Sequence, residues 1–277
     1  MEQLALVVSY DGTDFHGSQV QPGKRTVQGE LGDALHGLFG TRPVTTFAGR
    51  TDRGVHAARQ VVSLDDLRPD LSLATIGEAL NARLPSDLAI VSVRREPAGF
   101  NARYDARWRE YRYRVWSGKR APLAADRVWW RRASLDLGRM AEASAQLAGT
   151  HDFASFAGGG EGVPWSERQQ RPKGTVRTLF VSEVRVLPVW WGPTEADELL
   201  VEYRVVGTGF LPQMVRTIVA AIVDVGRGVR PTDWIGELLA RPDRRAAGGT
   251  AEASGLTLWQ IGYEDWPEDT VRASTRG

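Results

Sequence analysis

The alternation of strand and helix patterns in the first hundred residues constrains the fold more than any other feature. Apolar, β-branched runs typical of strands alternate with segments whose apolar residues recur at helical spacing. In chain order we predict strands and helices at residues 4–10, 27–39 (helix), 44–47, 60–64, 71–84 (helix) and 88–96. Thr26 is placed to cap the first helix, and Pro85 stops the second. This β-α-β-β-α-β order is that of the ferredoxin-like unit and predicts an α+β fold.

The second half of the chain resembles the first in its order of elements, with insertions. We predict strands and helices at 107–117, about 134–148 (helix), 176–188, 198–207, 210–228 (helix), 232–240 (helix) and 256–263. The glycine-rich stretch 157–175 is typical of a mobile loop. We therefore expect two ferredoxin-like, RRM-like halves with mixed antiparallel sheets that form a central cleft. The expected boundaries are an N-terminal α+β domain at 1–105, a C-terminal α+β domain at 106–263 and a flexible tail at 264–277.

Composition excludes several classes of protein. The 277 residues include no cysteine, which rules out disulfides, thiolate catalysis and cysteine-based metal sites. We find no apolar run of transmembrane length and no signal peptide, and we expect a cytoplasmic protein without a membrane partner. The net charge is +1, and lysine occurs only at positions 24, 119 and 173, so arginine supplies nearly all the positive charge. Arginine suits phosphate and base recognition in RNA, although composition alone favours a codon preference for arginine as the explanation.

One loop concentrates the groups that could carry chemistry. Between two predicted short strands, AGRTDRGVHAARQ (48–60) holds two Gly, three Arg, one Asp and one His. The cations flanking Asp52 favour its ionised form and attract phosphate, and glycine permits close approach of the backbone to a ligand. A carboxylate in this setting is a reasonable nucleophile for a polyanionic substrate. The alternative is a hairpin loop in which the aspartate caps its own backbone while the arginines face water.

Five ordered motifs give the chain a family resemblance. GRTDRGVHA (49–57) resembles the GRTDxGVHA signature of the tRNA pseudouridine synthase A family. Further segments resemble the same family in the same order: YDGTDFHGSQVQP (10–22), FNARYDARWREYRY (100–113), GTHDFASF (149–156) and GTGFLPQMVRTIVAAIVDVGRG (207–228). The resemblance implies an isomerase of tRNA processing that converts uridine to pseudouridine at positions 38, 39 and 40 of the anticodon stem-loop. It further implies tRNA as the RNA-binding partner, a homodimer, and no cofactor.

The resemblance also assigns roles to residues. Asp52 matches the family nucleophile, Tyr111 the tyrosine that stacks on the target base and is a candidate proton acceptor, and Arg216 the basic residue that pairs with the carboxylate. Arg50 matches an arginine that fills the space of a flipped nucleotide. We predict RNA contacts by Arg50, Arg53, His56, Arg109 and Arg112, of which the last two belong to an expected cationic face with Arg103, Arg107 and Arg114. The scattered histidines offer no metal-ligand spacing.

Other readings of these residues remain open. The chain could be a non-catalytic RNA-binding protein or RNA chaperone on the same scaffold. A hydrolase using Asp52 and His56 would lack a second acidic residue and an evident oxyanion site. Taken alone, Tyr111 fits a core position and Arg216 a buried structural pair. The sequence also departs from the family pattern at Pro212-Gln213 and at 251–254, where a usual proline is missing, and carries larger insertions at 157–175 and 189–197.

Overall fold

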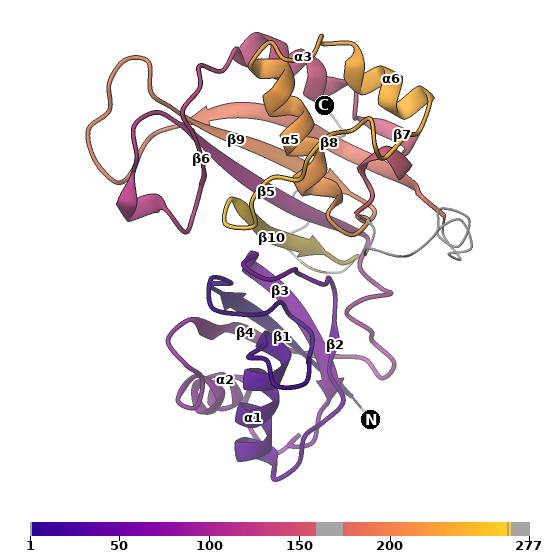
Figure 1. The fold of residues 1–277 in the computed structure, drawn as a ribbon. Helices are drawn as coiled ribbons and strands as arrows, with labels where there is room; N and C mark the ends of the chain where they lie inside the picture. The colour runs from indigo at the N-terminus through magenta and orange to yellow at the C-terminus, as the bar shows by residue number, and fades with distance from the viewer. Residues whose placement is uncertain (1, 159–173, 265, 267–277) are drawn as a thin grey trace. The chain divides into compact units, whose positions relative to one another are not determined.

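A computed structural model describes residues 2–158, 174–264 and 266 of the chain. These residues form two compact units (Figure 1). Unit 1 consists of the described residues up to Arg109 together with those from Thr257 onward, and unit 2 is Glu110–Leu256. Both units combine helices with sheet, which confirms the α+β class. The domain boundary expected at 105/106 and the expected central cleft both remain predictions. No described helix is long and apolar enough to cross a membrane.

Unit 1 begins with the predicted β-α-β-β-α-β order. Its elements are β1 (Gln3–Tyr10), α1 (Val27–Phe39), β2 (Thr46–Phe47), β3 (His56–Asp65), α2 (Leu73–Asn81) and β4 (Leu88–Glu96). The strands pair antiparallel in the order β4-β1-β3, with β2 on β3, which is the ferredoxin-like arrangement. The central strand β1 is buried along most of its length because it has neighbours on both edges. Strand β3 starts four residues earlier than predicted because Ala57 pairs with Tyr10 of β1.

Capping defines the first helix as the sequence predicted. The Thr26 hydroxyl accepts a hydrogen bond from the Gly29 amide at 3.2 Å, and Gly40 ends α1 in the left-handed conformation with φ of 73°. Helices α1 and α2 contact each other, and α2 packs on β4 (Figure 1). The apolar residues of α1 that face the sheet are buried, as their helical spacing predicted.

The end of the described chain completes unit 1. Strand β10 (Leu256–Gly262) pairs in parallel with β3, placing Thr257 opposite His56 and Leu258 opposite Ala57. The Tyr263 hydroxyl then donates to the Ala102 carbonyl at 2.6 Å. The sequence predicted this strand but grouped it with the second half, because the pattern gives no partner for it. The tail beyond Glu264 lies, except for Trp266, outside the described residues.

Unit 2 contains the remaining elements. They are β5 (Trp108–Ser117, which starts in unit 1), η1 (Pro122–Ala124), β6 (Trp129–Arg131), α3 (Leu137–Ala145), β7 (Gly149–Asp152), η2 (Ala154–Phe156), β8 (Val176–Leu187), β9 (Leu199–Gly207), α5 (Met214–Gly226) and α6 (Trp234–Ala240). The strand order is β5-β9-β8-β7, and the short β6 lies parallel to the end of β5. Helix α3 packs on β8 and on α5 (Figure 1). The sequence did not predict β6 and β7, which are too short for a period-2 pattern. The predicted loop 157–175 lies mostly outside the described residues.

Helix α5 is the buried helix of unit 2, and it starts later than predicted. Eleven of its thirteen residues are buried. Its start is set by Gln213, which has a left-handed backbone (φ 56°, ψ 3°) and follows Pro212. The helix therefore begins at Met214 instead of residue 210, which places Arg216 in its first turn. Gln213 is the only non-glycine residue with positive φ among the described residues.

Candidate active site

The loop from Ala48 to Val55 connects β2 to β3 and carries Asp52 at a tight turn. The Val55 amide donates to the Asp52 carbonyl at 3.1 Å, and Gly54 provides the positive φ of 78° that the turn requires. The Gly54 amide donates to the Phe15 carbonyl at 3.3 Å. The side chains of Asp52 and its neighbours Arg50 and Arg53 are exposed. The loop thus presents one carboxylate and two guanidinium groups to its surroundings.

Tyr10 at the end of β1 and Ser18 in the segment after it form hydrogen bonds with this loop. The Ser18 hydroxyl accepts from the Thr51 amide, and the Ser18 amide donates to the Thr51 carbonyl, both at 3.0 Å. The hydroxyls of Tyr10 and Thr51 are hydrogen-bonded at 2.8 Å in a buried position. Burial raises the pKa of Tyr10 to about 12, so this phenol stays neutral at ordinary pH and acts as a structural hydrogen-bonding group. Thr51, the residue before Asp52, is therefore fixed by its amide, carbonyl and hydroxyl groups.

Gly12 contacts the end of the loop at Val55 and the ring of His56. A Cβ atom on Gly12 would lie 2.0 Å from the Val55 carbonyl oxygen, so only glycine fits there. The Gly12 amide nitrogen lies 3.0 Å from Nδ1 of His56. The same nitrogen lies 3.1 Å from an Asp11 carboxylate oxygen. His56, predicted as an RNA contact, is buried, and its ring supports the backbone of the loop segment.

Arg109 also contacts the loop. Its Nε and Nη2 atoms donate to the Ala48 carbonyl at 3.1 and 2.9 Å, and Nη2 donates to the Arg103 carbonyl at 2.8 Å. Both acceptors lie in unit 1. Part of the guanidinium group predicted to bind RNA is therefore engaged at the start of the loop that carries Asp52.

The predicted cationic face is partly neutralised in unit 2 by two buried glutamates. Glu110 bonds Arg112 at 2.7 Å and Arg204 at 3.0 Å. Glu202 bonds Arg114 at 3.2 Å and also Arg185. Buried carboxylates require such partners because an unpaired buried charge is very costly. Sequence reasoning missed both glutamates, although a glutamate within an alternating aromatic strand such as β5 was a signal that could have identified Glu110.

Tyr111 and Arg216 lie in unit 2. The Tyr111 ring is buried and packs edge-on against Phe210, with ring centroids 5.0 Å apart. The Arg216 Nε atom donates to the Ala251 carbonyl at 2.7 Å, and the Ala251 amide donates to the Arg216 carbonyl at 3.2 Å. Nearby, burial raises the pKa of Tyr113 well above its usual value while the Arg216 charge opposes this shift. The Tyr113 hydroxyl donates to the Glu252 carbonyl at 2.6 Å.

Both departures from the family pattern lie next to Arg216. Pro212 and Gln213 precede α5, and the Pro212 carbonyl accepts from the Gly158 amide at 2.7 Å. The segment 251–254 is attached to Arg216 through Ala251 and to Tyr113 through Glu252. These departures therefore lie where they can set the position of the Arg216 side chain.

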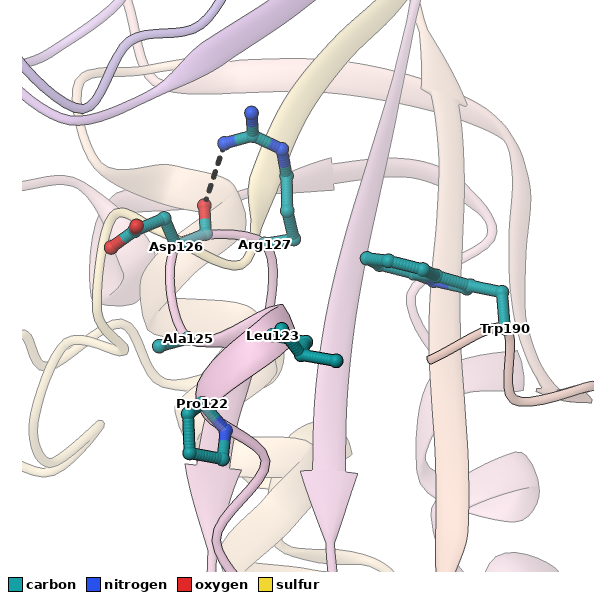
Figure 2. A pocket seen from close by; sticks show the side chains of 6 residues that line it. All are labelled: Pro122, Leu123, Ala125, Asp126, Arg127 and Trp190. Carbon is teal, nitrogen blue, oxygen red and sulfur yellow. Dashed lines mark hydrogen bonds between the residues drawn. The ribbon is translucent and has the colours of Figure 1, made fainter. Parts of the chain in front are cut away.

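A shallow pocket lies elsewhere in unit 2. Its volume is about 230 Å³, and it is lined by Pro122, Leu123, Ala125, Asp126, Arg127 and Trp190 (Figure 2). The Arg127 guanidinium donates to the Asp126 carbonyl at 3.1 Å, and Leu123 and Trp190 are largely exposed. None of the predicted site residues lines this pocket. Within the described ranges, no group of three or more His, Asp or Glu residues is placed to hold a metal ion.

Comparison with known proteins identifies the family. A family model described as tRNA pseudouridine synthase matches residues 6–105 and 143–264, which together contain Asp52 and Arg216. The chain belongs to the tRNA pseudouridine synthase family. Proteins named tRNA pseudouridine synthase A are similar over nearly the whole length. The protein from Geobacillus kaustophilus is 41% identical over 95% of both chains. That from Chloroflexus aurantiacus is 40% identical over 98% of this chain and 94% of its own, and that from Fervidobacterium nodosum is 40% identical over 94% and 99%.

This assignment confirms the resemblance seen in the sequence. The roles of individual residues stay predictions, because family membership does not test them. Unit 1 contains five of the predicted site residues, Asp52, Arg50, Arg53, His56 and Arg109. Unit 2 contains the other three, Tyr111, Arg112 and Arg216. Their assembly into one active site therefore belongs to the functional proposal.

Proposed function

We propose that this synthase isomerises uridine to pseudouridine in tRNA, with Asp52 as the nucleophile. The observation that supports this most directly is the position of Asp52. It is an exposed carboxylate in the signature GRTDRGVHA, on a loop braced by buried hydrogen bonds, in a chain similar to named tRNA pseudouridine synthases over nearly its full length. Because the loop backbone beside Asp52 is held in place, its carboxylate is positioned for attack on a bound substrate.

The reaction needs only groups that the chain contains. The N1–C1′ glycosidic bond of uridine breaks, the uracil turns over, and a new bond forms between C5 and C1′. The proton on C5 is lost and N1 gains one, so the product is an isomer and no electrons are exchanged with a cofactor. An ionised carboxylate can hold the ribosyl group while the base is detached, provided that water is kept away.

The remaining site residues take roles that fit their surroundings. Tyr111 is a rigid aromatic surface, packed on Phe210, against which the detached uracil can stack, and it is a candidate acceptor for the C5 proton. Arg216 is the proposed basic partner of the Asp52 carboxylate. Arg50 and Arg53 are exposed beside Asp52 and would contact the RNA backbone or fill the space of the flipped nucleotide. Arg109, Arg112 and His56 are further candidate RNA contacts, although each already makes an internal hydrogen bond.

The finer properties follow from the family resemblance. We expect modification at uridines 38, 39 and 40 of the anticodon stem-loop, a homodimer, and a cytoplasmic enzyme. Uridines in a loop or at a stem end are the cheapest to unstack, which fits these positions. Substrates in which each of the three uridines is replaced in turn by cytidine would identify the modified positions, and sedimentation equilibrium would measure the oligomeric state.

The decisive experiment compares the wild-type protein with Asp52→Asn. Asparagine keeps the size and much of the hydrogen bonding of aspartate but removes its charge. We expect pseudouridine at the anticodon arm of an unmodified tRNA with the wild type, no product with Asp52→Asn, and tRNA affinities within about three-fold of each other. Asp14→Asn, which changes an exposed aspartate outside the loop, is the matched control and should retain activity.

The alternative of a non-catalytic RNA-binding protein predicts a different outcome. In that case the wild type binds tRNA and forms no pseudouridine at any position. Equal turnover by the wild type and Asp52→Asn would instead remove the nucleophile assignment while leaving the enzyme assignment intact.

A further inference from the structure

The side chain of Gln60 makes a two-point contact with the loop that carries Asp52. Gln60 lies on β3 and is fully buried. Its Nε2 donates to the Gly49 carbonyl at 2.7 Å, and its Oε1 accepts from the Gly49 amide at 3.2 Å. One side-chain amide therefore satisfies both backbone groups of Gly49. The same Oε1 also accepts from the Val61 amide at 3.2 Å.

This contact replaces a missing piece of β-ladder. The Ala48 amide donates to the Val61 carbonyl at 2.9 Å, and β2 itself has already ended at Phe47. Beyond Ala48 the loop turns away from β3. The side-chain amide of Gln60 then supplies the hydrogen-bond donor and acceptor that a neighbouring strand would supply to the backbone of Gly49. Backbone groups left without partners in a buried environment are costly, so the contact fixes where the loop leaves the sheet.

The contact lies immediately before the residues with proposed roles. Gly49 precedes Arg50, and Thr51 on the other side of Arg50 is held by Tyr10 and Ser18. Arg50 thus sits between two fixed points, and Asp52 follows the second. Loss of the first fixed point would let Gly49 and Arg50 shift while β3 and the rest of the sheet keep their positions, and Thr51 and Asp52 would then be held from one side only.

We propose that Gln60 is a positioning residue of the pseudouridine synthase reaction, acting on Arg50 and Asp52 through the backbone of Gly49. This inference rests on the proposed function. The Gln60 side chain is buried, so it acts without touching the substrate. Its expected effect is on turnover, because initial tRNA binding depends on exposed cationic groups and the turnover step depends on the geometry of the loop.

The chain offers a matched control for this contact. The Asn81 amide in α2 donates to the Ile90 carbonyl at 3.0 Å and accepts from the Ile90 amide at 2.7 Å. This is the same two-point contact in the same unit, but it joins α2 to β4 and does not involve the loop. Removal of either side-chain amide leaves the amide and carbonyl of one residue, Gly49 or Ile90, without this partner, and Gln60→Ala also removes the bond to the Val61 amide. Both variants should therefore lose stability, Gln60→Ala somewhat more.

The experiment compares Gln60→Ala and Asn81→Ala in the full chain. We expect Gln60→Ala to lower kcat for tRNA by about ten-fold or more, with KM changed less than about two-fold. Asn81→Ala should keep kcat within about two-fold of the wild type. Hydrogen–deuterium exchange, which needs no substrate, should show amides of residues 48–52 exchanging about five-fold faster in Gln60→Ala only. If both variants lower kcat equally, or if exchange in the loop is unchanged, the positioning role is wrong.

A second variant guards against a purely structural explanation. In Gln60→Glu the carboxylate can accept from the Gly49 amide but cannot donate to its carbonyl until it is protonated. Burial raises the pKa of such a carboxyl group, so activity relative to the wild type should rise as the pH is lowered from about 8 to about 6. A constant ratio over this range would overturn the proposal. Absence of pseudouridine formation by the wild type would refute the proposed function instead, and the exchange measurement would still test the contact.

Discussion

The substitution Gly12→Ala tests how closely the backbone after β1 packs against the loop that carries Asp52. Gly12 is the second residue after β1, and its Cβ position lies 2.0 Å from the Val55 carbonyl oxygen, 2.4 Å from the Val55 carbonyl carbon and 3.0 Å from the Val55 nitrogen. All three atoms are backbone, so no side chain can rotate away. In Gly12→Ala the backbone at one of the two positions has to move.

The size of the movement follows from these distances. Ordinary contacts of a Cβ atom begin at about 3.4 Å, so the nearest distance must lengthen from 2.0 Å by about 1.4 Å. Forced overpacking costs about 1–3 kcal/mol, and a rigid backbone neighbour places this site at the upper end. Alanine lowers the entropy of the unfolded chain, which offsets about 0.4–1 kcal/mol. We expect a net loss of about 2 kcal/mol in the free energy of unfolding. Val55 is three residues from Asp52, and a displacement of about 1 Å at a reacting group can lower turnover by about 100-fold.

Urea denaturation and single-turnover pseudouridine formation measure the two effects. Gly249→Ala is the control, because a Cβ atom at that position has no neighbour within 4 Å and its φ is not positive. The control should change stability by less than about 0.5 kcal/mol and leave turnover unaltered. The reasoning is refuted if Gly12→Ala retains both the stability and the turnover rate of the control.

Two further predictions concern stability. The Arg25 guanidinium bonds both carboxylate oxygens of Asp87, at 2.7 and 2.8 Å, and holds the pKa of that carboxyl below its usual value. Because the folded pKa is the lower one, the stabilisation is complete above the unfolded pKa of about 3.9 and is lost as the pH falls through the folded value. Asp87→Asn should therefore cost about 1 kcal/mol at pH 7 in urea denaturation, and a difference that persists undiminished at the acid end would contradict this. Gln213→Asn should raise stability by about 0.5–1 kcal/mol, since asparagine tolerates the left-handed backbone at φ 56° better than glutamine does, and a lower Tm would contradict it.

The sequence predicted most helices and strands because caps, prolines and apolar spacing favour the same conformation as the packing of the fold. Helix α1 has the predicted bounds since its apolar spacing, its Thr26 cap and its terminal glycine all agree. Strand β4 likewise has the predicted bounds, because Pro85 and a β-branched run leave little choice. Helix α5 differs because its start depends on the backbone of Gln213, which no local propensity predicts.

The sequence pattern did not predict strand pairing or hydrogen-bond partners that lie far apart in the chain. Nothing in the residues of β10 indicates that they pair with β3, and nothing in Arg112 indicates that a buried glutamate two positions away accepts its hydrogen bond. The loop of Asp52 was predictable as a functional element from its motif. Its supporting contacts by Tyr10, Ser18 and Gln60 were not, because single polar residues within a strand or a turn do not reveal which backbone atoms they meet.

The parallel pairing of β10 with β3 has a consequence for biosynthesis. The ribosome delivers β1 to β4 first, but the strand that lines His56 and Ala57 arrives only after all of unit 2 has been made. Until then this edge of β3 lacks its parallel neighbour β10, and an open strand edge invites association with other chains. A nascent chain that stops before Thr257 contains the residues of unit 2 but lacks this neighbour of the Asp52 loop. Translation through β10 is therefore a condition for a fully supported Asp52 loop, and chains that stop before Thr257 are expected to be inactive and prone to aggregate.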